Sequence, residues 1–142
     1  MNKIKSSKGF TLMEMLIVVA IIAVLVAIAI PTFTTSLNKA RVATDEANIR
    51  SGYAAFMAKI MSEDEVPAKD TEYYLNKDGT LFWTFTDISY QCFGNQSDAG
   101  FRIAGHEVGE WSKGDRVRYV LTSAPDEKMT VKIEIDDDFD NP

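Results

Sequence analysis

The chain has 142 residues and a formal net charge of −6, and 46% of its residues are hydrophobic. This acidic balance argues against nucleic-acid binding by the bulk of the protein, because phosphate binding needs clustered Lys and Arg. A single cysteine, Cys92, excludes an intrachain disulfide, so packing alone must hold any folded part together. Because Tyr90 and Phe93 flank it, Cys92 is expected to be a small buried hydrophobic residue.

The apolar residues gather near the N-terminus, where residues 15–30 contain no polar side chain. Phe10 to Ile30 makes 21 residues. As a helix rising about 1.5 Å per residue, this stretch would cross the roughly 30 Å of bilayer hydrocarbon. Lysines at positions 3, 5 and 8 precede it, without an acidic residue, and predict a cytoplasmic N-terminus with the rest exported. A plain anchor and a secretory signal cut near Ala27-Ile28-Ala29 both fit this pattern.

Glu14 fits neither of these two interpretations. An acidic side chain near the centre of a spanning helix costs about 2.5–3.5 kcal/mol, and less near its end, where Glu14 lies. An ionisable residue within a membrane segment therefore indicates a function.

A third interpretation comes from the residues around Glu14. The apolar run and Pro31 follow the segment Lys8-Gly9-Phe10-Thr11-Leu12-Met13-Glu14. This pattern resembles the precursors of type IV pilins and pseudopilins. In that family a membrane-embedded aspartyl peptidase cuts a basic leader after its last Gly and methylates the new N-terminal amine. A Glu then lies five residues into the mature chain and a Pro lies 22 residues in, which Glu14 and Pro31 match.

The resemblance covers roughly the first 40 residues and assigns a role to each matching position. It implies cleavage after Gly9, methylation of Phe10, an assembly role for Glu14 and a helix kink at Pro31. Many pilins also carry a Gly midway through the apolar helix, where this chain has Ala23, so unwinding ahead of Pro31 is less favoured here.

The expected role of Glu14 is electrostatic. Cleavage after Gly9 would leave a charged amine on Phe10, and Glu14 is the only opposite charge at that depth. The pairing could form within one chain or between chains, and the resemblance favours the pairing between chains. Removing one partner of such a buried pair costs several kcal/mol.

The fold class expected for the whole chain is α+β. The long N-terminal helix should continue to about Met61, with an apolar first half that spans the membrane and an amphipathic second half. Two apolar faces follow helical spacing: Phe33, Leu37, Ala40, Ala47, Ala54, Met57 and Met61 on one, and Val42, Ile49, Tyr53, Phe56 and Ile60 on the other. One face is expected to cover a sheet and the other to meet neighbouring subunits, although both could pack within one domain.

The C-terminal half is expected to form a small antiparallel sheet of three or four strands on this helix. The expected strands are residues 72–75, 81–86, 117–122 and 129–135, and residues 101–103 are a candidate for a further short strand. Leu81, Trp83 and Phe85 should face the core, residues 123–128 should form a hairpin connection, and residues 94–114 should form a surface loop. The expected domains are a leader (1–9), a membrane and filament-core helix (10–30) and a pilin-like globular domain (31–142).

Enzymatic signals are absent from the sequence. The single histidine, His106, lies in a loop pattern typical of a surface residue, and neither a phosphate-binding loop nor a Cys/His metal pattern is present, so no cofactor is expected. The acidic end is a weak calcium candidate through Asp136, Asp137, Asp138 and Asp140. A solvated acidic tail is the preferred interpretation, because the segment lacks an EF-hand pattern.

Together these patterns predict a structural subunit of a type IV pilus-like filament. Its expected partners are other copies of itself, a prepilin peptidase, an assembly platform with its ATPase, and the membrane before assembly. The expected location is the inner membrane as a single-pass precursor and then a cell-surface fibre. The alternatives are a pseudopilin of a type II secretion or DNA-uptake system and, in another class, a membrane-anchored minor or tip subunit that acts as a binding module.

Overall fold

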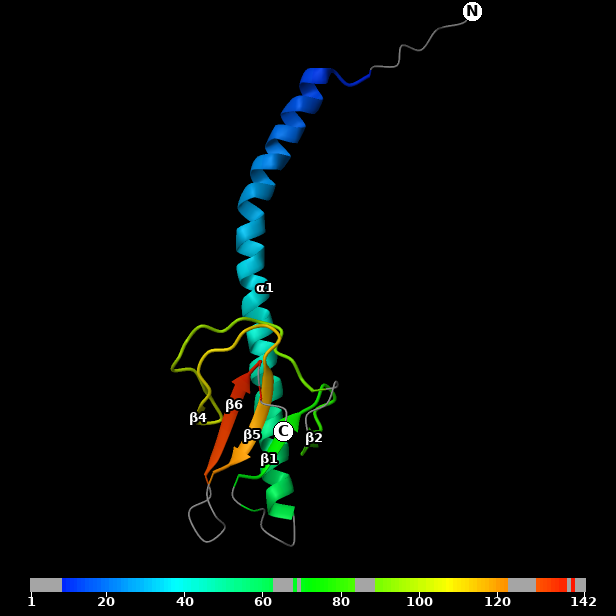
Figure 1. The fold of residues 1–142 in the computed structure, drawn as a ribbon. Coiled ribbons are helices and arrows are strands. Elements are labelled where there is room, and N and C mark those ends of the chain that lie inside the picture. Colours follow the sequence, from blue (N-terminus) through cyan, green and yellow to red (C-terminus); the bar gives the residue numbers. More distant parts are fainter. Residues whose placement is uncertain are drawn as a thin grey trace, which may run out of the picture. The chain divides into compact units, whose positions relative to one another are not determined.

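The structure is a computed structural model that describes residues 9–62, 68, 70–83, 89–122, 130–137 and 139. The chain divides into two compact units, Met1–Leu37 and Asn38–Pro142. A single helix, α1 (Leu12–Ser62), begins in the first unit and ends in the second, and all strands belong to the second unit (Figure 1). The predicted α+β class, with one long helix and a small antiparallel sheet, is therefore confirmed.

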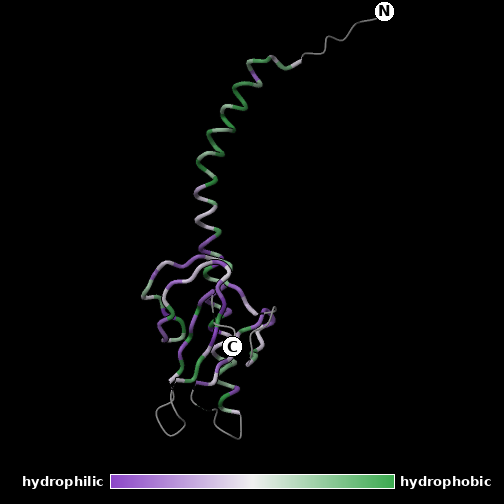
Figure 2. The backbone as a smooth tube through the Cα atoms, in the orientation of Figure 1, coloured by the Kyte–Doolittle hydropathy of each residue, from purple (hydrophilic) through white to green (hydrophobic). Residues whose placement is uncertain are grey.

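In the first unit, α1 is apolar on all sides. Every residue from Gly9 to Leu37 is exposed, and Figure 2 shows this part of the tube as almost continuously hydrophobic. Within the described part of the chain, α1 is the one helix long and apolar enough to cross a membrane. Such a surface is unfavourable in water and requires lipid or other apolar helices around it.

The helix continues through Pro31. Proline lacks the N–H that would bond to the carbonyl four residues earlier. The hydroxyls of Thr34 and Thr35 each donate to the Pro31 carbonyl at 3.0 Å, and Thr32 donates to the Ile28 carbonyl at 3.3 Å. Threonine hydroxyls that bond back to the preceding turn slightly weaken a helix. The kink at Pro31 stays a prediction.

In the second unit, four antiparallel strands form a sheet in the order β2-β1-β5-β6. Their bounds are β1 Glu72–Leu75, β2 Leu81–Phe82, β5 Arg116–Leu121 and β6 Val131–Asp136. A separate hairpin pairs β3 (Arg102–Ile103) with β4 (His106–Glu107). In β5, Val117, Tyr119 and Leu121 are all buried, as their alternation predicts.

The core of this unit lies where α1 meets the sheet. Helix residues Ile49, Phe56 and Ile60 are buried, and the Phe56 ring stacks on Tyr119 of β5 with their centroids 5.7 Å apart. The Tyr119 hydroxyl donates to the Ile49 carbonyl at 2.7 Å. A Cβ at Gly52 would lie 2.3 Å from that hydroxyl oxygen, so only glycine permits this close approach.

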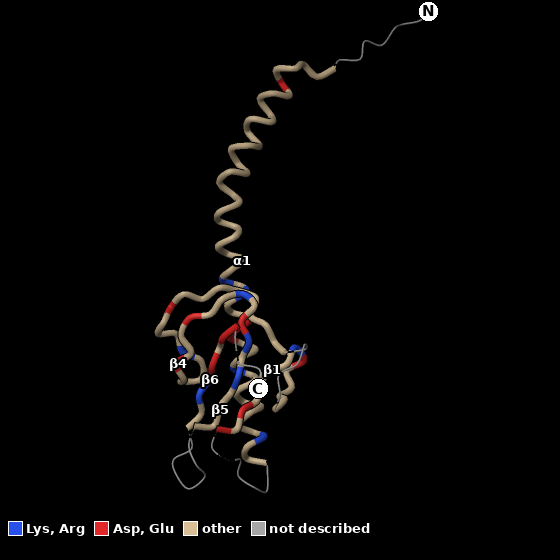
Figure 3. The backbone as a smooth tube through the Cα atoms, in the orientation of Figure 1, with Lys and Arg blue, Asp and Glu red and all other residues tan. Residues whose placement is uncertain are grey.

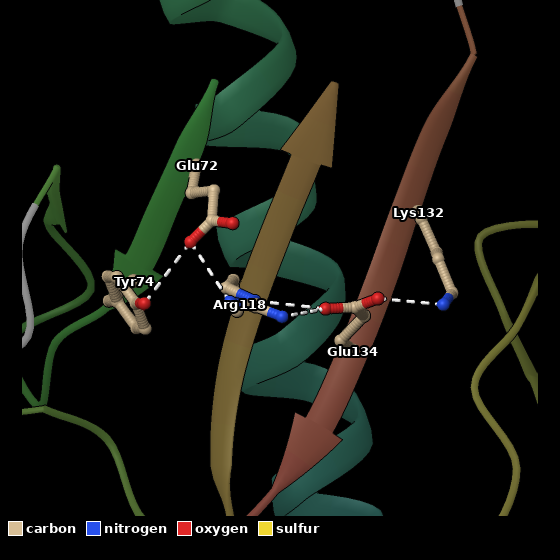
Figure 4. A network of polar contacts seen from close by, with 5 residues as sticks. All are labelled: Glu72, Tyr74, Arg118, Lys132 and Glu134. Atoms are coloured by element: carbon tan, nitrogen blue, oxygen red, sulfur yellow. Dashed lines mark hydrogen bonds and ion pairs between the residues drawn. The ribbon is translucent and has the colours of Figure 1, made fainter. Parts of the chain in front are cut away.

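On the other side of β5, a network of charged side chains joins three strands (Figure 4). The Arg118 guanidinium bonds to Glu72 of β1 at 3.0 Å and also to Glu134 of β6. Lys132 contacts the second oxygen of Glu134 at 2.7 Å. Near the C-terminus, Phe139 lies with its ring centroid 4.5 Å from the Arg118 guanidinium carbon, so this part of the acidic end rests on the sheet.

Two expectations for the second unit are wrong. Trp83 is 75% exposed instead of facing the core, because β2 ends at Phe82 and the alternation of a strand does not extend to Trp83. Residues 94–114 are not a plain surface loop, because they contain the β3–β4 hairpin and bury Ile103 and Trp111. Phe85, Met129 and the expected connection at 123–128 lie outside the described residues.

Candidate assembly site

The N-terminal end of α1 is held by two side chains that cap one another. Glu14 accepts hydrogen bonds on Oε2 from the Thr11 backbone N–H at 2.8 Å and from the Thr11 hydroxyl at 3.0 Å. In return, the backbone N–H of Glu14 donates to the Thr11 hydroxyl at 3.2 Å. Thr11 is the residue before the first helical residue and Glu14 is the third inside, which is the arrangement of a capping box.

This capping box determines where the helix begins. Thr11 supplies the oxygen that satisfies an otherwise unbonded N–H of the first turn, so the helix begins at Leu12. Gly9 and Phe10 therefore precede the helix, and both are exposed, Phe10 by 82%. The local partner of Glu14 was missed in the sequence, although the Thr-x-x-Glu spacing ahead of an apolar run is a recognisable sign of a capping box.

Glu14 lies in a long stretch of the sequence without any other charged residue. It is the only charged residue between positions 9 and 38, and Figure 3 shows it as a single acidic position in the first part of the helix. Among the described residues, the hydrogen bonds of its carboxylate all use Oε2. Its other oxygen can therefore accept a further donor while the capping box stays intact.

A buried acidic residue lies in the second unit. Asp45 of α1 is 0% exposed, and its carboxylate accepts from the Tyr90 hydroxyl at 2.6 Å. It also accepts from the backbone N–H of Phe93 at 2.9 Å and from that of Gly94 at 2.9 Å. These bonds fix the segment after β2 to the helix, as a buried carboxylate without an opposite charge requires several donors.

The two residues first considered for enzymatic chemistry are packed against the fold. Cys92 is 2% exposed, as predicted, and burial, together with the charges of Asp45 and Asp115, raises the pKa of its thiol. A thiol in this state is a poor nucleophile. His106 is half-buried, not a free surface residue, and its Nε2 lies 3.0 Å from the Tyr53 hydroxyl of α1.

The acidic end gives no support for a calcium site. Asp136 and Asp137 are exposed at the end of β6, whereas Asp138 and Asp140 lie outside the described residues. Within the described ranges, no group of three or more His, Cys, Asp or Glu side chains is arranged to hold a metal ion. The carbonyl of Asp137 accepts from Arg116 Nη1 at 2.9 Å, which ties the start of this segment to β5.

Comparison with known proteins places these features in a family. The model of the prokaryotic N-terminal methylation motif matches residues 4–30. A type IV narrow pilus major component, PilA5 of Thermus thermophilus, is 36% identical in an alignment of 104 residues that covers 69% of this chain and 87% of PilA5. Two fimbrial proteins of Pseudomonas aeruginosa are each 37% identical over 73 residues, about half of either chain. No solved structure gave a significant match.

The match to PilA5 covers most of both chains, and the long apolar helix on a small antiparallel sheet is the architecture that the sequence pattern predicted. Pilins are structural proteins whose apolar helix suits membrane anchoring before they polymerise into an extracellular pilus. The chain therefore belongs to the type IV pilin family and is a structural subunit of a type IV pilus-like filament.

Proposed function

We propose that this chain is made as a precursor that a prepilin peptidase cuts between Gly9 and Phe10. The observation that carries the proposal is the position of this bond, which is exposed and lies outside the helix. A peptidase needs an extended backbone, and a glycine without a side chain lets the backbone enter a narrow cleft. Nothing lies within 4 Å of the position that a Cβ on Gly9 would take.

The capping box contributes to this recognition. Thr11 caps the start of the helix, so the helix does not extend back to Gly9 and Phe10. The backbone groups of the scissile bond therefore stay free for the peptidase. The methylation motif that matches residues 4–30 includes residues on both sides of the bond. After cleavage, the amine of Phe10 becomes the N-terminus and is methylated by the same enzyme.

The second step of the proposal concerns assembly. The Phe10 amine carries a positive charge, and in the filament core it would be surrounded by apolar helices. Glu14 supplies the matching negative charge, and its Oε1 can accept the amine of an incoming subunit while Oε2 retains the bonds from Thr11. Each added subunit thereby neutralises a carboxylate that the membrane disfavours.

The remaining partners follow from this route. The lysine-rich leader stays in the cytoplasm, which places the second unit on the outer side of the membrane. An assembly platform and its ATPase supply the work that moves the apolar helix from lipid into the fibre. Pro31 removes a helix hydrogen bond and the threonines after it bond back to the preceding turn, so the helix can bend or unwind there as the subunits pack.

The intact mass of the subunit in sheared fibres tests the proposal. A mature chain that begins at Phe10 and carries one additional methyl group is expected. A chain that begins at Met1 would mean a plain membrane anchor, and a chain that begins near Ile30 would mean an ordinary secretory signal. Either of these results would overturn the proposed processing while leaving the family assignment intact.

A further inference from the structure

A groove in the second unit separates the start of its helix from the segment after β2. Helix α1 forms one wall and residues 95–101 form the other, and the groove has a volume of about 440 Å³. Val42, Ala43 and Phe101 supply apolar lining, whereas Lys39, Glu46 and Asp98 supply charged lining. The other lining residues are polar, so the groove combines three apolar side chains with polar and charged ones, a lining that suits an aromatic side chain with one polar end.

Hydrogen bonds hold the walls of this groove in place. Asn38 and Asn95 bond reciprocally: Asn38 Nδ2 donates to the Asn95 carbonyl at 2.8 Å, and the Asn95 N–H donates to Asn38 Oδ1 at 2.9 Å. The Gln96 side chain donates to the carbonyls of Asp98 and Gly109, both at 2.9 Å. The groove is therefore formed before anything binds, which lowers the entropic cost of binding.

Asp45 also helps to hold the two walls of the groove together. Its bonds to the backbone of Phe93 and Gly94 draw the chain against the helix just before the groove begins. A Cβ at Gly94 would lie 2.8 Å from the backbone nitrogen of Val42, so the approach requires a glycine. The buried acid that the sequence did not explain thus fixes one wall of the groove.

A projecting aromatic side chain lies elsewhere on the same unit. Trp83, directly after β2, is 75% exposed, and its neighbour Phe82 is 44% exposed. Figure 1 shows β2 and β4 on opposite sides of the helix, and the groove wall that ends at Phe101 leads directly into the β3–β4 hairpin. Tryptophan is enriched among the residues that contribute most to protein interfaces.

The symmetry of a filament relates these two features. An open helical polymer needs two different surfaces on each copy, one complementary to the other, since a surface that pairs with itself closes into a dimer. Copies of this chain polymerise into a filament, which gives the second units of different copies the opportunity to contact one another. A projecting ring beside β2 and a preformed groove beside the β3–β4 hairpin are two different surfaces of this kind.

We propose that the groove between α1 and residues 95–101 receives Trp83 of a neighbouring copy of this chain. The indole ring would cover Val42, Ala43 and Phe101. Its N–H would face the acidic side chains of Glu46 and Asp98 at the border, and a buried tryptophan N–H needs such an acceptor. The contact joins the second units of adjacent subunits and adds to the packing of their apolar helices.

Cross-linking within assembled fibres tests this contact. A chain with Phe82→Cys and Ala43→Cys retains Trp83 and places one thiol beside the ring and one in the groove. Cys92 stays in place, because it is 2% exposed and does not compete. Fibres are assembled from this chain mixed with the unmodified chain, treated with a short bismaleimide, and separated on a denaturing gel. The matched control replaces Ala43→Cys with Ala58→Cys, an exposed helix position outside the groove.

The proposal predicts a ladder of covalent multimers from the Phe82/Ala43 pair and none from the control pair or from either single variant. Dimers from Phe82→Cys alone would show that this edge pairs with itself, and fibres without a ladder would show that the groove is not the docking site. Either result overturns the proposal.

Fibre yield gives a second, independent readout. Trp83→Ala should lower the ratio of fibre to membrane subunit by roughly tenfold, the effect of losing a strong interface residue. Its unfolding temperature should not change, because the ring makes little contact within its own chain. Met61→Ala, which removes another exposed apolar side chain, serves as the control. Equal fibre yields from the Trp83 and Met61 variants would also overturn the proposal.

Discussion

Glu14 and Thr11 cap one another at the start of α1, so the acidic residue of the apolar segment has a partner within its own chain. The sequence alone predicted only one kind of partner for Glu14, the Phe10 amine of its own chain or of a neighbouring chain. In the structure its carboxylate is oriented toward the N-terminus, the end at which a neighbouring amine would have to arrive. The capping box therefore both lowers the cost of the charge in lipid and orients it for assembly.

The first prediction concerns Glu14. Glu14→Ala should leave membrane insertion unchanged or improve it, because a charge is removed from lipid. Fibre assembly should fail, because the amine of an incoming Phe10 would be buried without a counter-charge. Glu14→Gln keeps the size but loses the charge, so it should also be impaired. Processed subunit in the membrane is compared with subunit in sheared fibres, and a normal fibre yield from Glu14→Ala as the only pilin would refute the role.

The second prediction separates the capping box from the charge. Thr11→Val removes the hydroxyl and keeps the shape, whereas Thr11→Ser keeps the hydroxyl. In the uncut chain in detergent micelles, hydrogen exchange of the Glu14 backbone amide should be roughly fivefold faster in the valine variant, as expected for the loss of a helix cap. The serine variant should match the original chain. Unchanged protection in both would mean that the hydroxyl does not hold the helix end.

The third prediction concerns Asp45. Asp45→Asn keeps one carbonyl oxygen but turns an amide NH₂ toward groups that are themselves donors. It should lower the free energy of unfolding of the second unit by about 2–4 kcal/mol. Tyr90→Phe removes one donor alone and should cost only about 1 kcal/mol. Thermal unfolding of the full chain in detergent, followed by near-ultraviolet circular dichroism, measures both, and an Asp45→Asn chain as stable as the original would contradict the assignment.

Asp45 also shows where the sequence was informative and where it was not. The stripe of Ile49, Phe56 and Ile60 was predicted as a packing face because its helical spacing is regular. Asp45 lies on the same stripe, four residues before Ile49, but a charged residue at this position gives no sign in the sequence that it is buried. Its donors come from residues 45 to 49 positions away, and no local pattern announces contacts of that range.

The strands also differ in how well the sequence predicted them. In β5 and β6, whose six paired positions form a regular ladder, alternation predicted most of the buried side chains, although Val120 is buried as well and Ile135 is only half-buried. In β2, pairing with β1 covers only Leu81 and Phe82, and the side chain of Trp83 is no longer controlled by a ladder. In the β3–β4 hairpin, the sequence predicted a strand at residues 101–103, which contains β3, but β4 was missed because its two residues are too few to show a period.

The fourth prediction concerns pH. Burial raises the pKa of Glu134, but the hydrogen bonds and charges of Lys132 and Arg118 outweigh it and hold the pKa below the ordinary value of 4.5. A carboxyl group whose pKa is lowered by folding stabilises the fold at any pH above its ordinary pKa. This contribution is lost as the pH falls through the pKa of the folded state. The difference in unfolding temperature between the original chain and Glu134→Gln should therefore shrink below pH 4.5. A difference independent of pH would show that the network does not depend on this charge.

The fifth prediction concerns the turn of the β3–β4 hairpin. Ala104 has a φ of 52° and Gly105 a φ of 87°, and the two residues join the paired positions Ile103 and His106. Two successive positive φ values make this a type I′ turn, which favours Asn-Gly. An alanine in the left-handed region costs about 1–2 kcal/mol, so Ala104→Asn should stabilise the second unit by about 1 kcal/mol.

Gly105→Ala is the matched variant, since it introduces the same strain at the neighbouring position. No atom lies within 4 Å of the Cβ that it would add, so steric contact cannot contribute and only the backbone conformation is tested. It should lower the free energy of unfolding by about 1–2 kcal/mol. Thermal unfolding of both variants under identical conditions should move in opposite directions. If both lowered the unfolding temperature, the hairpin would not form the turn described, because the strain that Asn relieves at position 104 would be absent.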